Sequence, residues 1–413
     1  MKILLLSAWF PYPPINGSKI RLSNLIRQIA TRHEIDLLAF ARTIPVGEAQ
    51  AHLPALRQFC RKVDVVPARE FNPRSWDALR GFASTRPRSL VQTYSHRMAT
   101  LVADSLERNA YDVVIAFEAG APSLVSLLAS RIAGVPVVLE DIELTVLKDA
   151  FRTAGGPVSR VRHGLTWFKQ ARFTRRVLRS TAACIVPSEP ERQNLIPLVS
   201  GPCAIEVVPN CVDLTPCAGD FGPRDPRSLV FSGSITYHPN LDAADYFLSS
   251  IYGWIKAAVP DVNVNILGST NGVALNQLTV DTSVRFTGRI PDVRPLIARS
   301  WVSVVPLRLG AGTRVKIIES MAMGTPVVST RKGAEGLAVT HGENILIADE
   351  PKEFADAVVH LIRDPEFRRK LAVAGLQLVS TRYSSEVVGR TYRSILDRIA
   401  AAPRERRAGL QVF

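Results

Sequence analysis

The stretch RLGAGTRVKIIESMAMGTPVVST, residues 308–330, decides the fold of this chain. The apolar run at 302–307 predicts a buried strand before the glycine-rich loop, and PVVST at 326–330 predicts another strand after the helix. Gly324 and Pro326 are expected to end that helix. A strand, a loop, a helix and a second strand form the unit from which helix-covered parallel sheets are built.

The same alternation of apolar runs and helix-length stretches extends over the 413 residues, a length that favours two domains. Continuous apolar strands between helices are typical of a parallel sheet covered on both faces. We therefore expect the α/β class, with two Rossmann-like doubly wound domains that face each other across a cleft. Ser18 is the expected N-cap of a first helix at 18–30. The predicted strands are 3–6, 34–40, 112–117, 135–140, 182–188 and 204–210 in the first half, and 228–233, 262–268, 284–288, 302–307, 326–330 and 344–349 in the second.

The predicted domain boundaries follow a change in composition. Residues 214–226 are rich in Gly and Pro, which predicts a linker between an N-terminal domain (1–213) and a C-terminal domain (227–383). Residues 384–401 predict a closing helix that packs back toward the N-terminal domain, and 402–413 a mobile tail.

Charge and cysteine content limit the partners and the compartment. The formal net charge of +14 favours an anionic partner, which is a nucleotide, an acidic glycan, a phospholipid surface or a nucleic acid. The cysteines are scattered and odd in number, which indicates reduced thiols in a cytoplasmic protein. The apolar start of the chain is interrupted at Pro11 and predicts a first strand rather than a signal peptide. No apolar run reaches the roughly 20 residues of a membrane span.

Glycines and cations gather where the helix of 308–330 is predicted to begin. Gly310 and Gly312 let backbone N–H groups approach a ligand closely. Arg314 and Lys316 stand in the first turn, where the helix dipole makes cations unfavourable. A local cost of this kind indicates an anionic ligand such as a phosphate.

Two more residues complete this candidate site. Thr313 is the expected cap of a helix that starts at Arg314. Glu319 follows on the same helix and is placed to accept hydrogen bonds from two adjacent hydroxyls, as on a ribose. The alternative is that Lys316 and Glu319, three positions apart, form an ordinary surface pair worth about 0.2–0.5 kcal/mol.

Carboxylates also follow two predicted strands of the first half. Glu118 comes directly after the strand at 112–117 and is a candidate cleft acid. Glu140, Asp141 and Glu143 follow the next strand. Each is either a cleft acid or a solvated loop carboxylate, and the solvated alternative is favoured.

The 308–330 stretch resembles the signature of the family 4 glycosyltransferases, whose GT-B fold places a nucleotide sugar between two Rossmann-like domains. Further motifs of that family are found along almost the whole chain, and the branch it resembles most is associated with exopolysaccharide clusters. The matching segments are WFPYPPINGSKIR (9–21), VPSEPERQNL (186–195), VVPNCVD (207–213), FSGSITYHPNLDAADYF (231–247), GAEGL (333–337) and RYSSEVVGRTYRSIL (382–396).

The resemblance implies a hexosyltransferase that moves a sugar from a nucleotide-diphosphate sugar to a glycan or lipid-linked acceptor with retention of configuration. No protein nucleophile is generally agreed for that class, and the donor's own phosphate is expected to take the acceptor's proton. Catalytic roles fall to Arg314, Lys316 and Glu319. The implied donor-binding residues are Gly17, Gly233, Ser234, Gly310, Ala311, Gly312, Thr313 and Glu335.

Three features of the sequence depart from the family pattern. The first of two glutamates that the family often carries would fall at Ala311, so its contact to the sugar must come from the backbone or from another residue. GSITYHPN at 233–240 lacks the Arg and Lys that many members carry there, and Cys211 replaces a usual Gly. We expect no cofactor and no metal, because the chain lacks the D-x-D arrangement of metal-dependent transferases. Arg314 and Lys316 are expected to stabilise the leaving diphosphate instead.

Localisation and the rival functions depend on the basic residues. The segment 159–180 is the most basic of the chain. It predicts either a helix with a solvated basic face or an attachment to the inner face of the cytoplasmic membrane. A sugar-nucleotide epimerase of the same fold is one alternative function, and it would need cleft acids. A basic nucleic-acid-binding protein is another, which the small share of aromatic residues (7%) disfavours.

Overall fold

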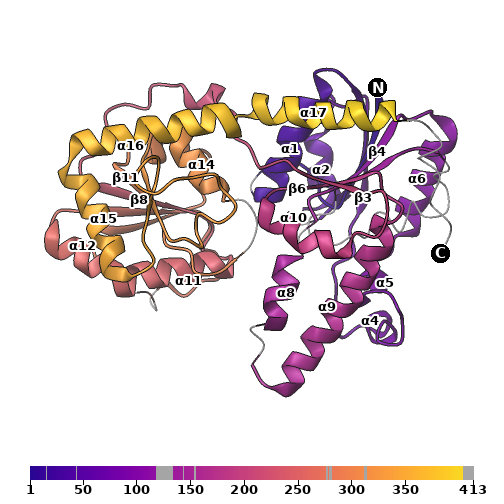
Figure 1. Ribbon diagram of the computed structural model, residues 1–413, viewed down its shortest axis with the longest axis horizontal. Coiled ribbons are helices and arrows are strands. Elements are labelled where there is room, and N and C mark those ends of the chain that lie inside the picture. The colour runs from indigo at the N-terminus through magenta and orange to yellow at the C-terminus, as the bar shows by residue number, and fades with distance from the viewer. Residues whose placement is uncertain are drawn as a thin grey trace. The chain divides into compact units, whose positions relative to one another are not determined.

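A computed structural model of the chain describes residues 1–14, 16–42, 44–117, 134–142, 144–152, 155–275, 278, 281–310 and 314–402. The chain divides into two compact units, one formed by Met1–Pro209 with the residues from Gly389 onward, and the other by Asn210–Val388. In each unit, helices lie on both faces of one parallel sheet (Figure 1). The predicted α/β class with two Rossmann-like domains is confirmed.

The sheet of the first unit is built from the buried apolar runs of the N-terminal half. Its neighbouring strands pair in parallel, and the strand order is β3-β2-β1-β4-β5-β6-β7. The strands are β1 (Lys2–Ser7), β2 (Glu34–Ala41), β3 (Lys62–Pro67), β4 (Val113–Phe117), β5 (Val137–Glu140), β6 (Ala183–Val186) and β7 (Ala204–Val207).

The sheet of the second unit repeats this topology. Its order is β10-β9-β8-β11-β12-β13, again with parallel neighbours. The direction of winding reverses between β1 and β4 in one sheet and between β8 and β11 in the other. Doubly wound sheets bind ligands beyond the carboxyl ends of the strands at such a reversal. The strands are β8 (Ser228–Ser232), β9 (Asn263–Leu267), β10 (Val284–Gly288), β11 (Val302–Val305), β12 (Val327–Ser329) and β13 (Leu346–Ile347).

Helices connect the strands in both units. Those of the first unit are α1 (Gly17–Ala30), α2 (Val46–Ala51), α3 (Leu53–Leu56), α4 (Trp76–Arg80), α5 (Arg88–Thr93), α6 (His96–Arg108), α8 (Thr145–Arg152), α9 (Pro157–Leu178) and α10 (Glu189–Leu195). Those that follow are α11 (His238–Tyr246), α12 (Tyr252–Ala258), α13 (Arg294–Arg299), α14 (Val315–Ala322), α15 (Pro351–Arg363), α16 (Pro365–Leu378) and α17 (Ser385–Ala401). A π-helical segment, Phe247–Ile251, joins α11 to α12, and another, Val379–Tyr383, follows α16.

Two details of the secondary structure predicted for the first unit are wrong. The side-chain oxygen of Asn16 caps α1 by accepting from the Lys19 backbone N–H (2.9 Å), so Ser18 lies inside the helix. Strand β3 was not predicted, because Lys62 and Asp64 interrupt its apolar run. Since β3 is an edge strand, these charged side chains reach water and form an ion pair there (2.8 Å).

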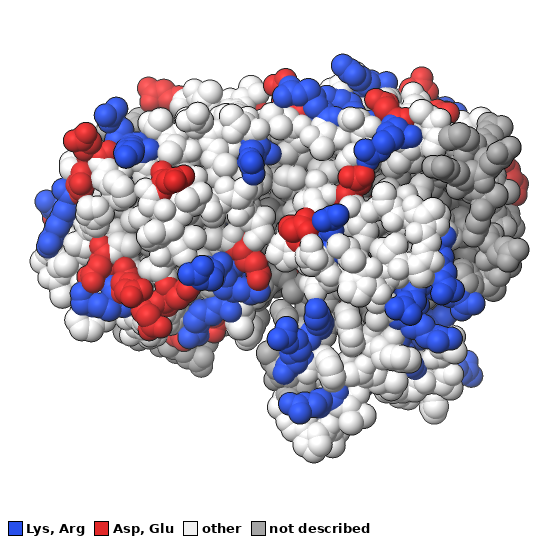
Figure 2. Space-filling model, in the orientation of Figure 1, with Lys and Arg blue, Asp and Glu red and all other residues white. Residues whose placement is uncertain are grey.

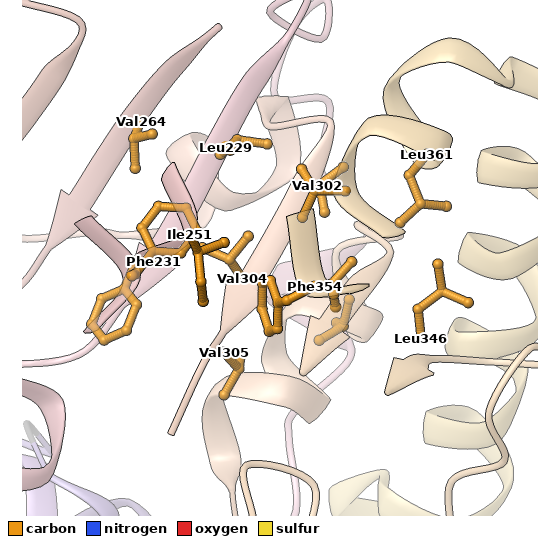
Figure 3. Close-up of a cluster of buried hydrophobic side chains, with 14 of the residues drawn as sticks. Leu229, Phe231, Ile251, Val264, Val302, Val304, Val305, Leu346, Phe354 and Leu361 are labelled. Atoms are coloured by element: carbon orange, nitrogen blue, oxygen red, sulfur yellow. The ribbon is translucent and has the colours of Figure 1, made fainter. Parts of the chain in front are cut away.

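Aromatic and branched side chains fill the core of the second unit (Figure 3). Phe231 of β8, Val304 of β11 and Phe354 of α15 are each fully buried. The ring of Phe354 meets that of Phe247 edge-on, with centroids 6.4 Å apart. Full burial of such a side chain contributes about 1.5–3 kcal/mol, so this core fixes the ends of β8 and β11.

The C-terminal helix is divided between the two units, whereas a residue of the predicted linker contacts the second unit. From Gly389 onward α17 belongs to the first unit, where Arg393 donates to the carbonyl of Gln28 (2.7 Å). Arg224, in the segment predicted as the linker, donates to the carbonyl of Gly324 in the second unit (2.7 Å). The predicted mobile tail lies outside the described residues after Ala402.

The state of the cysteines and the length of the apolar helices can be compared with the sequence analysis. All five cysteines are free thiols, and four of them are buried. Within the described part of the chain, no helix is both long enough and apolar enough to cross a bilayer.

Candidate functional site

The candidate site of the second unit lies at the reversal of its sheet. Gly233 directly follows β8, and Gly310 lies in the loop that leaves β11. Both have positive φ angles, of 150° and 100°, which favour glycine. The sheet topology therefore brings together two glycines that the sequence placed 77 positions apart, at the edge where a ligand is expected.

Lys316 points from α14 toward Gly233. Its Nζ donates to the side-chain oxygen of Asn240 (2.8 Å) and lies 4.8 Å from the ring centroid of Phe231. A Cβ atom on Gly233 would lie 2.8 Å from this Nζ, which is closer than real Cβ contacts. Glycine at 233 thus leaves the space in which the ammonium sits.

The pKa of Lys316 is lowered to about 7, mainly by burial and then by the charge of Arg314. The charge of Glu319 raises the pKa of Lys316, but by less than burial and Arg314 lower it. A half-buried ammonium of this kind gains from an anionic ligand, because the ligand supplies the charge that the surroundings lack.

Asn240 is the residue of this site that the sequence analysis missed. Its amide nitrogen donates to the carbonyl of Ser234 (2.9 Å), while its amide oxygen holds Lys316. The amide fixes the ammonium without cancelling its charge, as a carboxylate would. The signal was present in HPN at 238–240, shortly after the predicted donor-binding residues Gly233 and Ser234, but only the fold shows that Asn240 reaches Lys316.

Arg314 lies at the head of α14 and ties two loops together. Its Nη2 donates to the carbonyls of Gly310 (2.7 Å) and Lys332 (3.3 Å), and it lies 3.9 Å from the Glu335 carboxylate. The helix begins at Val315 with Arg314 as its N-cap residue, so the predicted helix start at Arg314 is one residue too early. The guanidinium is largely buried, and its hydrogen bond to Gly310 holds the loop after β11 in place.

Glu335 lies in the turn after β12, where its carboxylate pairs with Lys332 (2.5 Å). The turn can form only because of Gly333, since a Cβ there would lie 2.6 Å from the carbonyl oxygen of Val305. The Glu335 carboxylate therefore lies near the Arg314 guanidinium, which in turn binds the carbonyl of Gly310.

Glu319 is half-buried on α14, one turn after Lys316. Burial raises the pKa of Glu319 to about 7, and the charge of Lys316 opposes that rise. Among the ion pairs of the described residues none joins Lys316 to Glu319, and Lys316 binds Asn240 instead. The alternative of an ordinary surface pair is therefore not what the structure forms.

Of the other sequence-predicted residues, Ser234 adjoins this cluster through its carbonyl, and Gly17 lies in the first unit. Gly17 is the first residue of α1 in the first unit, and no atom lies within 4 Å of the place its Cβ would occupy. Ser234 follows Gly233 and hydrogen-bonds Thr236 through its hydroxyl (2.8 Å). The remaining candidates, Glu118, Ala311, Gly312 and Thr313, lie outside the described residues, as does Glu143.

Glu140 and Asp141 correct an expectation, because neither is a solvated loop carboxylate. Both are buried at the carboxyl end of β5, and Arg21 of α1 donates to Glu140 (2.7 Å). Burial raises the pKa of Glu140 to about 7 even though Arg21 opposes the rise. Because Arg21 stands 119 positions away in the chain, its pairing with Glu140 could not be predicted from the sequence.

Family profiles match both halves of the chain. The profile described as "Glycosyl transferase 4-like domain" matches residues 16–211, and "Glycosyl transferases group 1" matches residues 226–364. The chain belongs to the glycosyltransferases. These matches favour sugar transfer over the epimerase and nucleic-acid alternatives.

Curated proteins similar to this glycosyltransferase match it over parts of their length. The lipopolysaccharide core biosynthesis glycosyltransferase LpsE of Rhizobium meliloti (strain 1021) is 35% identical over 121 residues, which are 29% of this chain and 35% of LpsE. An uncharacterized 44.6 kDa protein in the cps region of Klebsiella pneumoniae is 21% identical over 169 residues, which are 39% of this chain and 44% of the relative. The matches span less than half the length of these relatives.

A solved structure shares the whole fold of this glycosyltransferase. Anabaena Alr3699/HepE in complex with UDP and glucose has a TM-score of 0.67 and 16% identity, over 96% of this chain and 99% of that one. The likeness confirms the predicted GT-B fold.

Proposed function

We propose that this glycosyltransferase moves a sugar from a nucleotide-diphosphate sugar to a glycan or lipid-linked acceptor, with retention of configuration. The pathway would be the synthesis of exopolysaccharide or of another cell-surface polysaccharide. One observation carries the proposal: Lys316, a cation held by an amide, lies against Gly233 at the reversal of the second sheet. A cation beside open backbone at that place suits the diphosphate of a nucleotide.

The relatives support the substrates and the pathway. LpsE is named for lipopolysaccharide core biosynthesis, and the Klebsiella relative is encoded in a cps region, which agrees with a role in cell-surface polysaccharide. The Anabaena structure holds UDP and glucose, which agrees with a nucleotide-diphosphate sugar as donor.

The proposed chemistry needs stabilisation of a leaving group more than a protein nucleophile. The bond between the anomeric carbon and the phosphate oxygen breaks, and a bond from that carbon to an acceptor oxygen forms. The acceptor's proton passes to the departing phosphate. Negative charge grows on the diphosphate as the sugar gains oxocarbenium character, and a fixed cation there lowers the barrier. We assign this role to Lys316 and Arg314, and propose no metal or cofactor.

Transfer is tested by incubating the full chain with a panel of nucleotide sugars, with and without a bacterial lipid extract as acceptor source. We expect one donor to release free nucleoside diphosphate faster when the extract is present, and the product to keep the donor's anomeric configuration by NMR. Conversion of the donor to an epimer without net release of diphosphate would contradict sugar transfer. An inverted product would contradict retention alone.

We also propose that the protein is cytoplasmic and attached peripherally to the inner face of the membrane through residues 159–180. The segment forms most of α9 and carries seven Lys or Arg residues without an Asp or Glu. Cations near an anionic bilayer surface each add about 1 kcal/mol to binding.

Glu319→Gln is expected to weaken the binding of a nucleoside diphosphate by about tenfold, because a neutral amide accepts a weaker hydrogen bond from a ribose hydroxyl than a carboxylate does. A 2′-deoxy analogue should lose less affinity in the variant than in the wild type, as measured by calorimetry. Gln377→Glu on the exposed face of α16 serves as a control for altered surface charge. Equal losses for the analogue in both proteins would remove the ribose contact.

The affinity for a nucleoside diphosphate is expected to fall as the pH rises from 7 to 9, by up to about tenfold per unit. In the free protein the pKa of Lys316 is about 7, so its ammonium is charged below that pH and loses its charge above it. Asn240→Asp would place a carboxylate against Nζ, raise the pKa of Lys316 and shift the decline to higher pH. The same carboxylate would compete with the diphosphate and lower the affinity at pH 7. A flat wild-type profile between pH 7 and 9, measured by calorimetry, would contradict a role for Lys316.

A further inference from the structure

Helices α8 and α9 of the first unit form a hairpin that projects from its sheet (Figure 1). The two helices pack closely at Gly164, where a Cβ would lie 2.9 Å from the ring of Phe151. The inner end of α9 is anchored in the unit by Val177 and Leu178, which are buried. The hairpin is therefore packed against its own unit at its inner end, and its outer end is available to bind a partner.

The solvent face of α9 changes character along its length. Four apolar residues, spaced three, four and three positions apart, occupy one face of its outer half, with exposures from 43% at Leu165 to 82% at Val158. The same spacing continues into exposed arginines in its inner half and at its C-cap residue. The apolar residues are Val158, Val161, Leu165 and Phe168, and the arginines are Arg172, Arg175, Arg176 and Arg179.

Helix α4, whose end is bound to α9, carries a further exposed aromatic side chain. Lys169 of α9 donates from Nζ to the carbonyl of Phe82 (2.8 Å) and to that of Gly81 (3.2 Å), at the end of α4. Trp76 at the start of α4 is 80% exposed, the most exposed aromatic side chain among the described residues. Exposed apolar side chains that gather in one region mark a binding surface.

Charge decides between the two occupants that such a surface could take. A second copy of the chain would bring an equal set of cations, since α9 has no Asp or Glu and the whole chain carries a net charge of +14. An anionic bilayer supplies both the opposite charge and an apolar phase. Lys and Arg side chains also cluster over the hairpin on the face seen in Figure 2.

We propose that the outer face of α9, together with Trp76, inserts into an anionic bilayer while the arginines of its inner half bind lipid headgroups. This arrangement is that of interfacial helices, which place aromatic and branched side chains at the headgroup boundary and cations in contact with anionic lipid. The inference deepens the proposed membrane attachment and rests on it. It adds that the apolar residues are as necessary as the cations.

The test measures how much of the full chain floats with vesicles of phosphatidylcholine alone or with phosphatidylglycerol added. The wild type should float only with the anionic vesicles, and much less near 1 M salt, where the Debye length is about 3 Å. Replacing Arg172, Arg175, Arg176 and Arg179 with Gln should reduce the partition coefficient by about fivefold for each cation that meets lipid. Val161→Ser, Leu165→Ser and Phe168→Ser together should reduce it by about tenfold or more.

Matched controls separate insertion from a general loss of surface apolarity. Val373→Ser changes an exposed apolar residue of α16 in the other unit and should leave flotation unchanged. Brominated lipids should quench tryptophan fluorescence in the wild type and less in Trp76→Phe, whereas Trp254→Phe should keep the quenching. Trp254 is also exposed but belongs to α12.

The outcomes keep this inference distinct from the proposed function. Nucleoside diphosphate binding should be the same in wild type and in all α9 variants, and its absence in the wild type would count against sugar transfer alone. Equal flotation of the wild type and the serine variant would overturn insertion. Insertion would also be overturned if the wild type failed to float and instead formed a dimer in sedimentation velocity that the serine variant does not form.

Discussion

Lys316→Ala is expected to lower sugar transfer by about a hundred- to a thousandfold, the usual cost of removing one charge-stabilising donor from a transition state. The unfolding temperature should not fall. The pKa of Lys316 is lowered by burial, so its charged form costs stability at pH 7, and the substitution removes that cost. Lys352→Ala on the exposed surface of α15 is the control.

Arg314→Ala gives a useful contrast to this variant. Its guanidinium binds the carbonyls of Gly310 and Lys332, so the substitution should lower both transfer and the unfolding temperature. Transfer close to that of the wild type in both variants would contradict the assignment of the diphosphate contact to the head of α14.

Gly233→Ala is expected to weaken the binding of a nucleoside diphosphate by about ten- to a hundredfold. The new Cβ would lie 2.8 Å from both Lys316 Nζ and Asn240 Nδ2, so the ammonium must leave the position that the amide gives it. The φ of 150° adds backbone strain to this steric conflict.

Calorimetry of this variant against Gly253→Ala checks the effect. Gly253 lies in α12 of the same unit, with no atom within 4 Å of the place of its Cβ, so the control should bind like the wild type. Equal affinity in Gly233→Ala and the control would show that the space at Gly233 is not needed.

The loop and helix at 308–330 show how far the sequence could carry the prediction. Their local pattern predicted the strand, the loop and the helix, and it marked the glycines, the cations and the carboxylate as candidate binding residues, because these features lie within a few residues of one another. The end of the helix was also predicted, and Gly324 has the positive φ of a C-terminal glycine. The true start, with Arg314 as the N-cap residue, was missed by one residue because caps depend on side-chain geometry.

Contacts between residues far apart in the chain could not be predicted from the sequence. Asn240 meets Lys316 from 76 positions away, and Arg21 meets Glu140 from 119 positions away. The exposure of the apolar face of α9 could not be predicted for a different reason. Leu165 and Phe168 have the spacing of a core-facing stripe, and only the fold shows that this stripe faces solvent.

The central claim is that a diphosphate binds between Lys316 and the glycines at the end of β8 and β11. The most direct measurement is the unfolding temperature of the wild type and Lys316→Ala in the presence of each common nucleoside diphosphate, since a ligand bound only by the folded state raises it. We predict that at least one nucleoside diphosphate raises the unfolding temperature of the wild type and leaves that of Lys316→Ala unchanged. The same rise in both proteins, or no rise with any nucleoside diphosphate, would contradict the claim.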